Sequence, residues 1–317
     1  MLIHEILDYA RENKISDIHI LENEKVYFRK FGEIFKDNIF SKINRSQLES
    51  ICLNKIDEDF IFMDKQNRYR ISSFLTMGKL GLSIRVIDNE LILLKERFIN
   101  ELIHKKILTL KDGLILVTGA TGSGKSTTLA NFIECFNQEK NYKILTLEDP
   151  IEYVFKNRKS YIIQREIGKD VKNYEIALKN ALRQDPDIVV VGEIRDIESL
   201  DAVLKLAETG HLVLTTLHTN SAVESINRIV SMVLAEKKDF IRQQLASVLR
   251  FIFSQELYID KEKQKRNAIF EILNNTKAVS NLILNNKINQ IPNLIESGID
   301  NYMITKERYF SMIEKKA

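Results

Sequence analysis

The distribution of apolar residues changes partway along the chain. In the first part, short runs alternate apolar and polar residues, which is typical of strands with one solvated face. These runs are 16–20, 25–34, 67–75 and 81–87. Apolar residues at helical spacing over 2–13 and 46–55 predict two amphipathic helices beside the strands. We therefore expect a small α+β domain over residues 1–90.

From Ile103 onward, short and wholly apolar runs alternate with segments at helical spacing. Such runs are typical of strands that are buried on both faces of a mainly parallel sheet. The expected strands are 113–118, 143–148, 187–192 and 212–217, and the expected helices are 125–139, 173–184, 197–209 and 221–234. Beyond Phe240 the pattern predicts helices with short polar breaks. The predicted fold class is α/β, with a second domain over 103–317 and a short ordered linker over 91–102.

A glycine-rich segment lies between the expected strand 113–118 and the expected helix 125–139. It reads Gly119-Ala120-Thr121-Gly122-Ser123-Gly124-Lys125-Ser126, which fits the phosphate-loop pattern G-x-x-x-x-G-K-[ST]. The glycines let the backbone turn its N–H groups toward an anion. Lys125 can reach the β- and γ-phosphates, and the Ser126 hydroxyl can ligate Mg²⁺. A glycine-rich turn that binds nothing is disfavoured, because the flanking strand and helix are both expected.

Acidic residues follow two of the expected strands. Glu148 closes the second strand, Asp149 and Glu152 come just after it, and Glu193 follows the third strand. Carboxyl ends of parallel strands meet at the edge of the sheet where a nucleotide binds. One of the first three acids can therefore hold the attacking water, and Glu193 can reach Mg²⁺ through its water shell. A polar strand end capped by a turn is the alternative for the first group.

Arg195 and two histidines complete the candidate chemistry. Arg195 is close enough in sequence to Glu193 to pair with a carboxylate or with phosphate oxygens, and a structural ion pair is the alternative. His211 and His218 flank the expected strand 212–217. Together they suggest a sensor that hydrogen-bonds differently to triphosphate and diphosphate, whereas one histidine alone is more often a packed structural residue.

Composition restricts the class of protein. The chain has 317 residues, which fits two domains, and 44% apolar with 29% charged residues is typical of a soluble globular protein. A net charge of +3 gives no indication of a nucleic-acid partner. Cys52 and Cys135 lack metal-ligand spacing. We find neither an apolar run long enough to span a bilayer nor a signal peptide, so we expect a cytoplasmic protein.

Four segments resemble the motifs of the secretion and type IV pilus ATPases. In chain order, GATGSGKST, LTLEDPIEY, ALRQDPDIVVVGEIRD and TGHLVLTTLHTNSA resemble their Walker A motif, Asp box, Walker B motif and His box. The early SDIHI and its alternating strands resemble their amino-terminal domain. Near the end, AVSNLILNNKINQI is similar to the AIRNLIRE-type helix of the PilT retraction ATPases. The resemblance thus covers essentially the whole chain.

This resemblance implies the fold and the assembly. It implies a PAS-like first domain, a RecA-like second domain and a homohexameric ring, with ATP bound between the two domains and near the neighbouring subunit. Arg70 and Arg85 lie on the paired strands of the first domain whose arginines reach the phosphates in that family. A solvated strand edge is the alternative for these two residues.

The resemblance also implies residue roles. Glu152 is the general base for water, Glu193 supports Mg²⁺ with Ser126, and His218 communicates the nucleotide state together with His211. The implied nucleotide contacts are Gly119, Thr121, Gly122, Ser123, Gly124, Lys125, Ser126, Thr127, Arg195 and His211.

The implied function is ATP hydrolysis that drives type IV pilus retraction, at the cytoplasmic face of the inner membrane and through a pilus platform protein. Two departures bear on it. Ser280 and Leu284 stand where the retraction motif usually has arginines, which weakens the link to retraction. The tetracysteine insertion and longer amino-terminal extension typical of extension and type II secretion ATPases are also absent, which weakens the link to assembly.

Three alternatives follow from the same residues. One is an ATPase for type II secretion or pilus assembly. Another is a nucleic-acid-translocating ring ATPase, which the near-neutral charge and the lack of a basic patch with aromatic residues disfavour. The third is a nucleotide-binding regulator with negligible turnover, which the presence of both Glu152 and Glu193 disfavours.

Overall fold

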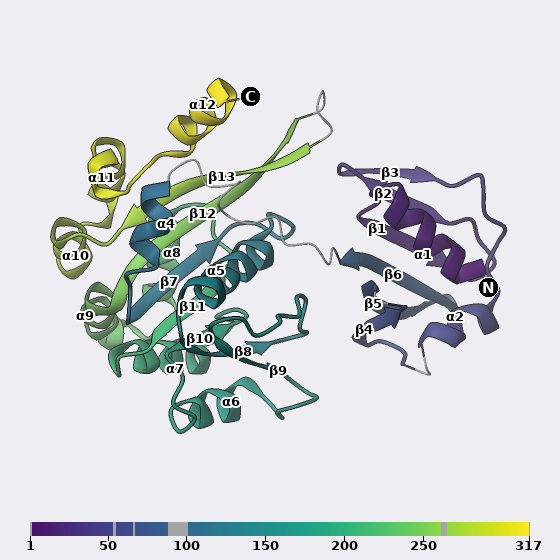
Figure 1. Cartoon of the computed structure of the whole chain (residues 1–317), viewed down its shortest axis with the longest axis horizontal. Helices are drawn as coiled ribbons and strands as arrows, with labels where there is room; N and C mark the ends of the chain where they lie inside the picture. Colours follow the sequence, from purple (N-terminus) through teal and green to yellow (C-terminus); the bar gives the residue numbers. More distant parts are fainter. Residues whose placement is uncertain (1, 53–54, 66, 88–100, 261–264, 317) are drawn as a thin grey trace. The chain divides into compact units, whose positions relative to one another are not determined.

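The chain forms two compact units, 1–90 and 91–317, each built on its own sheet (Figure 1). The computed structural model describes residues 2–52, 55–65, 67–87, 101–260 and 265–316. The predicted linker, 91–102, lies outside these described residues except at its last two positions, where a helix begins.

The first unit is an antiparallel sheet with two helices. Its elements are α1 (Leu2–Glu12), β1 (Asp17–Leu21), β2 (Tyr27–Lys30), β3 (Glu33–Lys36), α2 (Arg45–Cys52), β4 (Asp59–Asp64), β5 (Asn67–Thr76) and β6 (Lys79–Ile87). The strand order is β3-β2-β1-β6-β5-β4. The apolar stripe of α1, which includes Ile6 and Leu7, is buried in one core with inward-facing strand residues such as Ile18 and Ile84. The two predicted helices and the predicted strands 16–20, 67–75 and 81–87 are confirmed. The predicted run 25–34 is instead two paired strands, β2 and β3, and β4 was not predicted.

The second unit is a seven-stranded sheet with helices on both faces. Its elements are α4 (Glu101–Ile107), β7 (Gly113–Thr118), α5 (Lys125–Glu139), β8 (Lys143–Glu148), β9 (Tyr161–Glu166), α6 (Tyr174–Ala181), β10 (Ile188–Val191), α7 (Ile197–Glu208), β11 (Leu212–Leu217), α8 (Ala222–Ser231), η1 (Ala235–Lys237), α9 (Lys238–Val248), β12 (Leu249–Asp260), β13 (Lys265–Asn274), α10 (Lys277–Leu284), η2 (Ile288–Gln290), α11 (Ile291–Ser297), η3 (Ile299–Asn301) and α12 (Lys306–Lys316). The strand order is β13-β12-β7-β11-β10-β8-β9, and every neighbouring pair is parallel except β12 with β13.

Strand β7 explains why the central strands read as unbroken apolar runs. Its residues are all buried, and alternate ones belong to different cores. Leu114 and Leu116 pack with α7 and α9, whereas Ile115 and Val117 pack with Phe132 of α5 on the opposite face. Because both faces are covered by helices, neither face needs polar residues. The predicted strands of this sheet are therefore confirmed within a residue at each end.

The prediction of helices beyond Phe240 was wrong for residues 249–260 and 265–274. There β12 and β13 form a long antiparallel hairpin, and β12 also runs parallel to β7. Phe251 and Phe253 of β12 are fully buried on one face of the sheet, with Ile252 buried on the other. A short apolar run cannot be assigned to helix or strand by its periodicity alone, so this strand was read as helix. Strand β9 was likewise not predicted.

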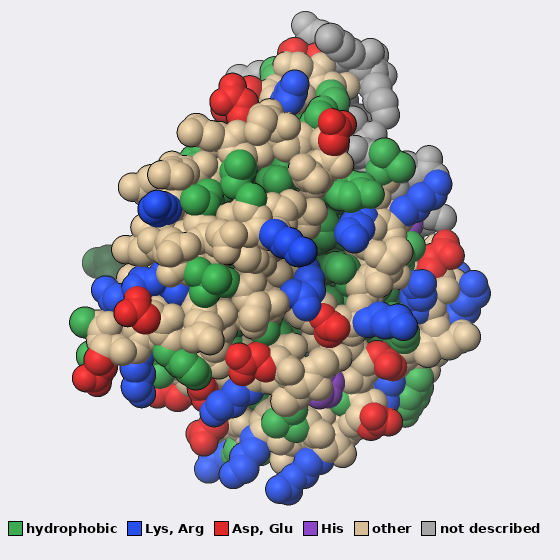
Figure 2. All heavy atoms as spheres, turned by 90° about the vertical axis from the view of Figure 1, so that its left-hand side faces the viewer, with side chains coloured by type: hydrophobic (Ala, Val, Ile, Leu, Met, Phe, Trp, Pro, Cys, Tyr) green, Lys and Arg blue, Asp and Glu red, His purple; other side chains and the backbone are tan. Residues whose placement is uncertain are grey.

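The described surface carries both signs of charge. On the face drawn in Figure 2, Lys and Arg side chains lie among acidic and apolar side chains. Within the described ranges, no helix combines the length and the apolar character that crossing a membrane requires.

Candidate nucleotide site

The phosphate loop joins the end of β7 to the start of α5. Gly119 and Gly124 have φ values of 151° and 87°, in the region that favours glycine. Gly124 is the N-cap of α5, so the loop leads directly into the positive end of that helix. A Cβ atom at Gly119 would lie 2.4 Å from the Gln255 carbonyl oxygen. The glycines are thus required both by conformation and by close packing.

Lys125 lies at the first position of α5 and turns back over the loop. Its Nζ donates to the carbonyl oxygens of Gly119 at 2.8 Å and Ala120 at 2.9 Å. Burial lowers the pKa of Lys125, while the negative charges of Glu193 and Glu152 act in the opposite direction. Since a charged phosphate oxygen is a stronger acceptor than a neutral carbonyl, a phosphate competes well for this ammonium group.

Glu193 lies directly beyond β10 and connects to Lys125 through a histidine. His218 Nε2 lies 3.0 Å from Glu193 Oε2, and His218 Nδ1 lies 3.4 Å from Lys125 Nζ. Arg195 bonds the other Glu193 oxygen and lies 3.2 Å from Asp149. Burial alone would raise the pKa of Glu193, but its bonds with Arg195 and His218 outweigh this effect and lower it. The carboxylate therefore stays ionised, and Arg195 forms the ion pairs expected of its structural alternative.

The three acids at and beyond the end of β8 have three different environments. Glu148 accepts hydrogen bonds from Thr146 at 2.6 Å and from Gln164 at 3.3 Å, and burial raises its pKa. Asp149 pairs with Arg195. Glu152 lies on the irregular segment between β8 and β9, and its negative charge acts on Lys125. Of the three, Glu152 is the one whose negative charge acts to raise the pKa of the loop lysine.

The remaining predicted phosphate contacts follow from the loop and the first turn of α5. Thr121 and Ser126 are exposed, whereas Ser123 is buried and its hydroxyl has no hydrogen-bond partner among the described residues. The exposed Ser126 hydroxyl and the ionised Glu193 carboxylate are oxygen donors of the kind that Mg²⁺ binds. The donor chemistry of this site therefore fits a magnesium ion.

His211 is not brought to this site within the chain. It immediately precedes β11, whose first residue pairs with Gly113 at the start of β7, whereas His218 follows the end of β11 beside the loop. His211 Nδ1 instead lies 3.0 Å from Thr209 Oγ1 and 3.1 Å from the Leu206 carbonyl oxygen, at the end of α7. The two histidines that flank one strand are thus separated by its whole length.

Arg70 and Arg85 lie opposite each other on β5 and β6 of the first unit. Arg70 Nε donates to Asp59 at 2.8 Å, and Arg85 Nε donates to Asp17 at 2.9 Å. Both strands are interior to their sheet rather than at its edge, while both arginine side chains remain partly exposed. The structure thus pairs the two arginines across neighbouring strands and gives each a carboxylate partner, Asp59 of β4 for Arg70 and Asp17 of β1 for Arg85.

Two supporting residues were not identified from the sequence. Tyr153 Oη lies 2.9 Å from Thr127 Oγ1, so the segment that carries Glu152 is tied to the first turn of α5. Gln255 of β12 contacts the loop itself. Tyr153 is part of the segment LTLEDPIEY, but its hydrogen bond with Thr127 depends on the fold. Gln255 lies on β12, which was predicted to be helical.

The residues that depart from the retraction motif lie far along the chain, on α10. Ser280 Oγ lies within hydrogen-bond distance of the Ala246 carbonyl oxygen at 3.0 Å, and Leu284 is exposed.

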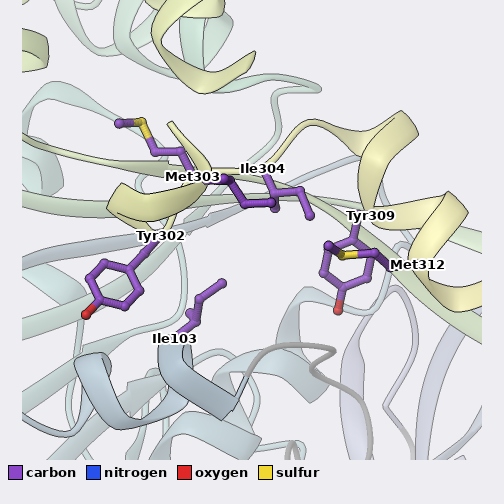
Figure 3. A pocket seen from close by; sticks show the side chains of 7 residues that line it. Ile103, Tyr302, Met303, Ile304, Tyr309 and Met312 are labelled. Carbon is purple, nitrogen blue, oxygen red and sulfur yellow. The ribbon is translucent and has the colours of Figure 1, made fainter. Parts of the chain in front are cut away.

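A separate cavity near the end of the chain has apolar walls (Figure 3). Ile103 of α4 and Tyr309 of α12 face into it. With no charged group in its lining, this cavity is unsuited to phosphate.

A family model described as type II/IV secretion system protein matches residues 1–308. The match covers nearly the whole chain. The chain belongs to this family. Its relatives include the uncharacterized Escherichia coli protein YggR, which is 38% identical in an alignment of 319 positions that covers 98% of this chain and 97% of YggR. The Pseudomonas aeruginosa type IV pilus retraction ATPase PilT is 36% identical in an alignment of 311 positions that covers 94% of this chain and 90% of PilT.

Solved structures of similar chains share the fold of this family member. The crystal structure of the pilus retraction motor PilT with bound ADP matches with a TM-score of 0.86 and 36% identity, covering 100% of this chain and 94% of that one. The Legionella pneumophila ATPase DotB matches with a TM-score of 0.79 and 26% identity, covering 99% and 95%. The predicted fold class, a small α+β domain followed by a RecA-like ATPase domain, is confirmed, as is the family resemblance.

Proposed function

We propose that this family member is a Mg²⁺-dependent ATPase that powers type IV pilus retraction. The observation that carries the proposal is the path from Lys125 through His218 to Glu193. It joins a phosphate-binding cation to a carboxylate suited to Mg²⁺, which is the arrangement that phosphoryl transfer needs.

The relatives support retraction more than secretion. Besides PilT, a Neisseria gonorrhoeae twitching motility protein is 38% identical over 272 residues. By contrast, the chain covers only 47% of the Xanthomonas campestris type II secretion protein E, at 32% identity. Retraction, the function that the sequence resemblance implies, is therefore the better supported of the two, and secretion or pilus assembly is the alternative.

The chemistry can be assigned to residues of the site. The N–H groups of the loop and Lys125 bind the β- and γ-phosphates of ATP. Mg²⁺ bound by Ser126 and Glu193 would neutralise the charge that develops on the phosphate oxygens. Glu152 accepts a proton from the water whose oxygen attacks the γ-phosphorus, and ADP leaves with the electron pair of the broken P–O bond.

Assembly supplies the rest of the proposed motor. We place the chain in a homohexamer at the cytoplasmic face of the inner membrane, in contact with a pilus platform protein and without nucleic acid. Arg70 and Arg85 are the proposed arginine fingers. Their ion pairs with Asp59 and Asp17 are partly exposed. Such pairs contribute little to stability, so exchanging them for phosphate contacts costs little.

Two variants separate turnover from binding. Glu152→Gln should keep ATP affinity and lower kcat about 10²- to 10⁴-fold, because it removes a general base. Lys125→Ala should weaken ATP binding itself. Glu148→Gln is the matched control, and a smaller loss is expected because glutamine still accepts the Thr146 bond. Calorimetric ATP binding and phosphate release measure both quantities, and unchanged turnover in Glu152→Gln would move the base to Glu148 or Asp149.

A further inference from the structure

Gln255 reaches the phosphate loop from outside it. Its side chain is 3% exposed on β12, and its Nε2 donates to the Ser123 carbonyl oxygen. Its Oε1 lies 2.6 Å from Thr128 Oγ1 on α5. A carbonyl oxygen only accepts, whereas a hydroxyl both donates and accepts. The orientation of the amide is therefore fixed, with its nitrogen toward Ser123 and its oxygen toward Thr128.

The backbone of the loop packs against the same residue at two glycines. A Cβ atom at Gly119 would lie 2.4 Å from the Gln255 carbonyl oxygen, and one at Gly124 would lie 2.9 Å from Gln255 Nε2. A Cβ atom does not come this close to a non-bonded oxygen or nitrogen atom, so a side chain at either glycine would require a shift. Gly119 and Gly124, two of the three loop glycines, thus allow the loop to pack directly against Gln255. They also permit the positive φ angles of the loop.

The bond to Ser123 also orients an N–H group. The Ser123 carbonyl and the Gly124 N–H belong to one peptide unit, and in a planar trans peptide they point in opposite directions. A donor that holds the Ser123 oxygen on the β12 side therefore holds the Gly124 hydrogen on the opposite side. An anion-binding loop needs its N–H groups, and not its carbonyl oxygens, to face the phosphates.

We propose that Gln255 is a positioning residue for ATP binding, whose amide holds the Ser123–Gly124 peptide with its N–H toward the phosphates. This inference rests on the proposed function, because it assumes that the loop binds ATP. Rotation of that peptide would replace a donor by a carbonyl oxygen, which repels phosphate. The residue acts through the loop backbone and need not touch the nucleotide.

Gln255→Glu tests the donor role with little change in side-chain size. An ionised carboxylate can still accept from Thr128 but cannot donate to Ser123, so the affinity for ATP should fall at least tenfold at pH 8. A protonated carboxyl group donates as the amide does, and burial raises the pKa of such a group. The ratio of variant to wild-type Kd should therefore shrink as the pH is lowered from 8 toward 6.

Two further variants control this experiment. Gln255→Met has a similar length and no donor, so its loss of affinity should be about the same at every pH. Glu256→Gln changes the next residue of the strand, whose carboxylate lies 3.4 Å from Lys306 rather than at the loop, and should bind ATP as the wild type does. Circular dichroism and thermal melting establish that each variant is folded.

Calorimetric titration with ATP and Mg²⁺ distinguishes the outcomes. A wild-type chain that does not bind ATP contradicts the proposed function. A wild-type chain that binds, together with Gln255→Glu binding equally well at pH 8, overturns the role of Gln255. A loss in Gln255→Glu that is the same at all pH values also overturns it, because packing alone would then explain the effect. If Gln255→Glu does not fold, wild-type affinity in folded Gln255→Met overturns the role as well.

Discussion

Replacing Tyr153 by phenylalanine should slow ATP turnover without weakening ATP binding. The change removes one hydroxyl, whose oxygen lies 2.9 Å from Thr127 Oγ1 in a partly buried position. A hydrogen bond of this kind contributes a net of about 0.5–1.5 kcal/mol. At about 1.4 kcal/mol for each factor of ten, its loss corresponds to a roughly 2- to 12-fold effect. Because the bond holds the segment that carries Glu152, we expect the effect in kcat and not in KM.

Steady-state phosphate release with varied ATP separates these two parameters. Tyr161→Phe is the matched control, since Tyr161 is 57% exposed on β9 and should leave both parameters unchanged. A double-mutant cycle with Thr127→Val gives the coupling between the two side chains. If they act through their shared bond, the double variant should lose about as much in kcat as Tyr153→Phe alone. Fully additive losses, or a change confined to KM, would refute the reasoning.

Three other predictions concern the arginines, the core and the loop lysine. An Arg70→Ala, Arg85→Ala double variant should keep ATP binding and lose most turnover, because arginine fingers contribute about 10³ to 10⁵ in rate; full turnover in a variant that still forms rings would sink this idea. Phe132→Ala should lower the free energy of unfolding in urea by about 3–5 kcal/mol, since Phe132 is 1% exposed and packs 5.2 Å from the Phe253 ring. The control Phe240→Ala, at a side chain 58% exposed, should stay within about 0.5 kcal/mol of the wild type. As the pH rises, the affinity for ATP should begin to fall at a lower pH than it would with an exposed lysine, because burial lowers the pKa of Lys125. Over the same pH range Lys125 loses its buried charge, so the free energy of unfolding should rise while the affinity for ATP falls. If both quantities fell together, this account would be contradicted.

The sequence predicted those elements whose pattern of apolar residues, together with the flanking residues, is compatible with only one kind of secondary structure. The central strand β7 is buried on both faces and is bounded by a glycine-rich loop, so its unbroken apolar run had a single interpretation. β12 is also buried, but its apolar run follows the helix α9 without an intervening loop. The periodicity of apolar residues cannot show where the helix ends and the strand begins. The strand that pairs with β12, which is β13, lies later in the chain.

Site residues that belong to a sequence motif could be predicted. The contacts that those residues make with distant parts of the chain could not, because they depend on the tertiary structure. Spacing alone indicated the phosphate loop and the acids after the strands. It could not tell that Arg195 pairs with two carboxylates or that His211 lies at the far end of β11. Gln255 follows Gly124 by more than one hundred positions, so only the pairing of β12 with β7 brings them together.

Counting surface pili in cells that lack the gene tests the central claim most directly. Cells should be complemented with the wild-type chain or with Glu152→Gln, and pili counted by electron microscopy. A retraction motor predicts more pili than normal in the deletion strain, normal numbers with the wild-type chain and no rescue by Glu152→Gln. Cells without pili would contradict retraction and indicate that the chain drives pilus assembly.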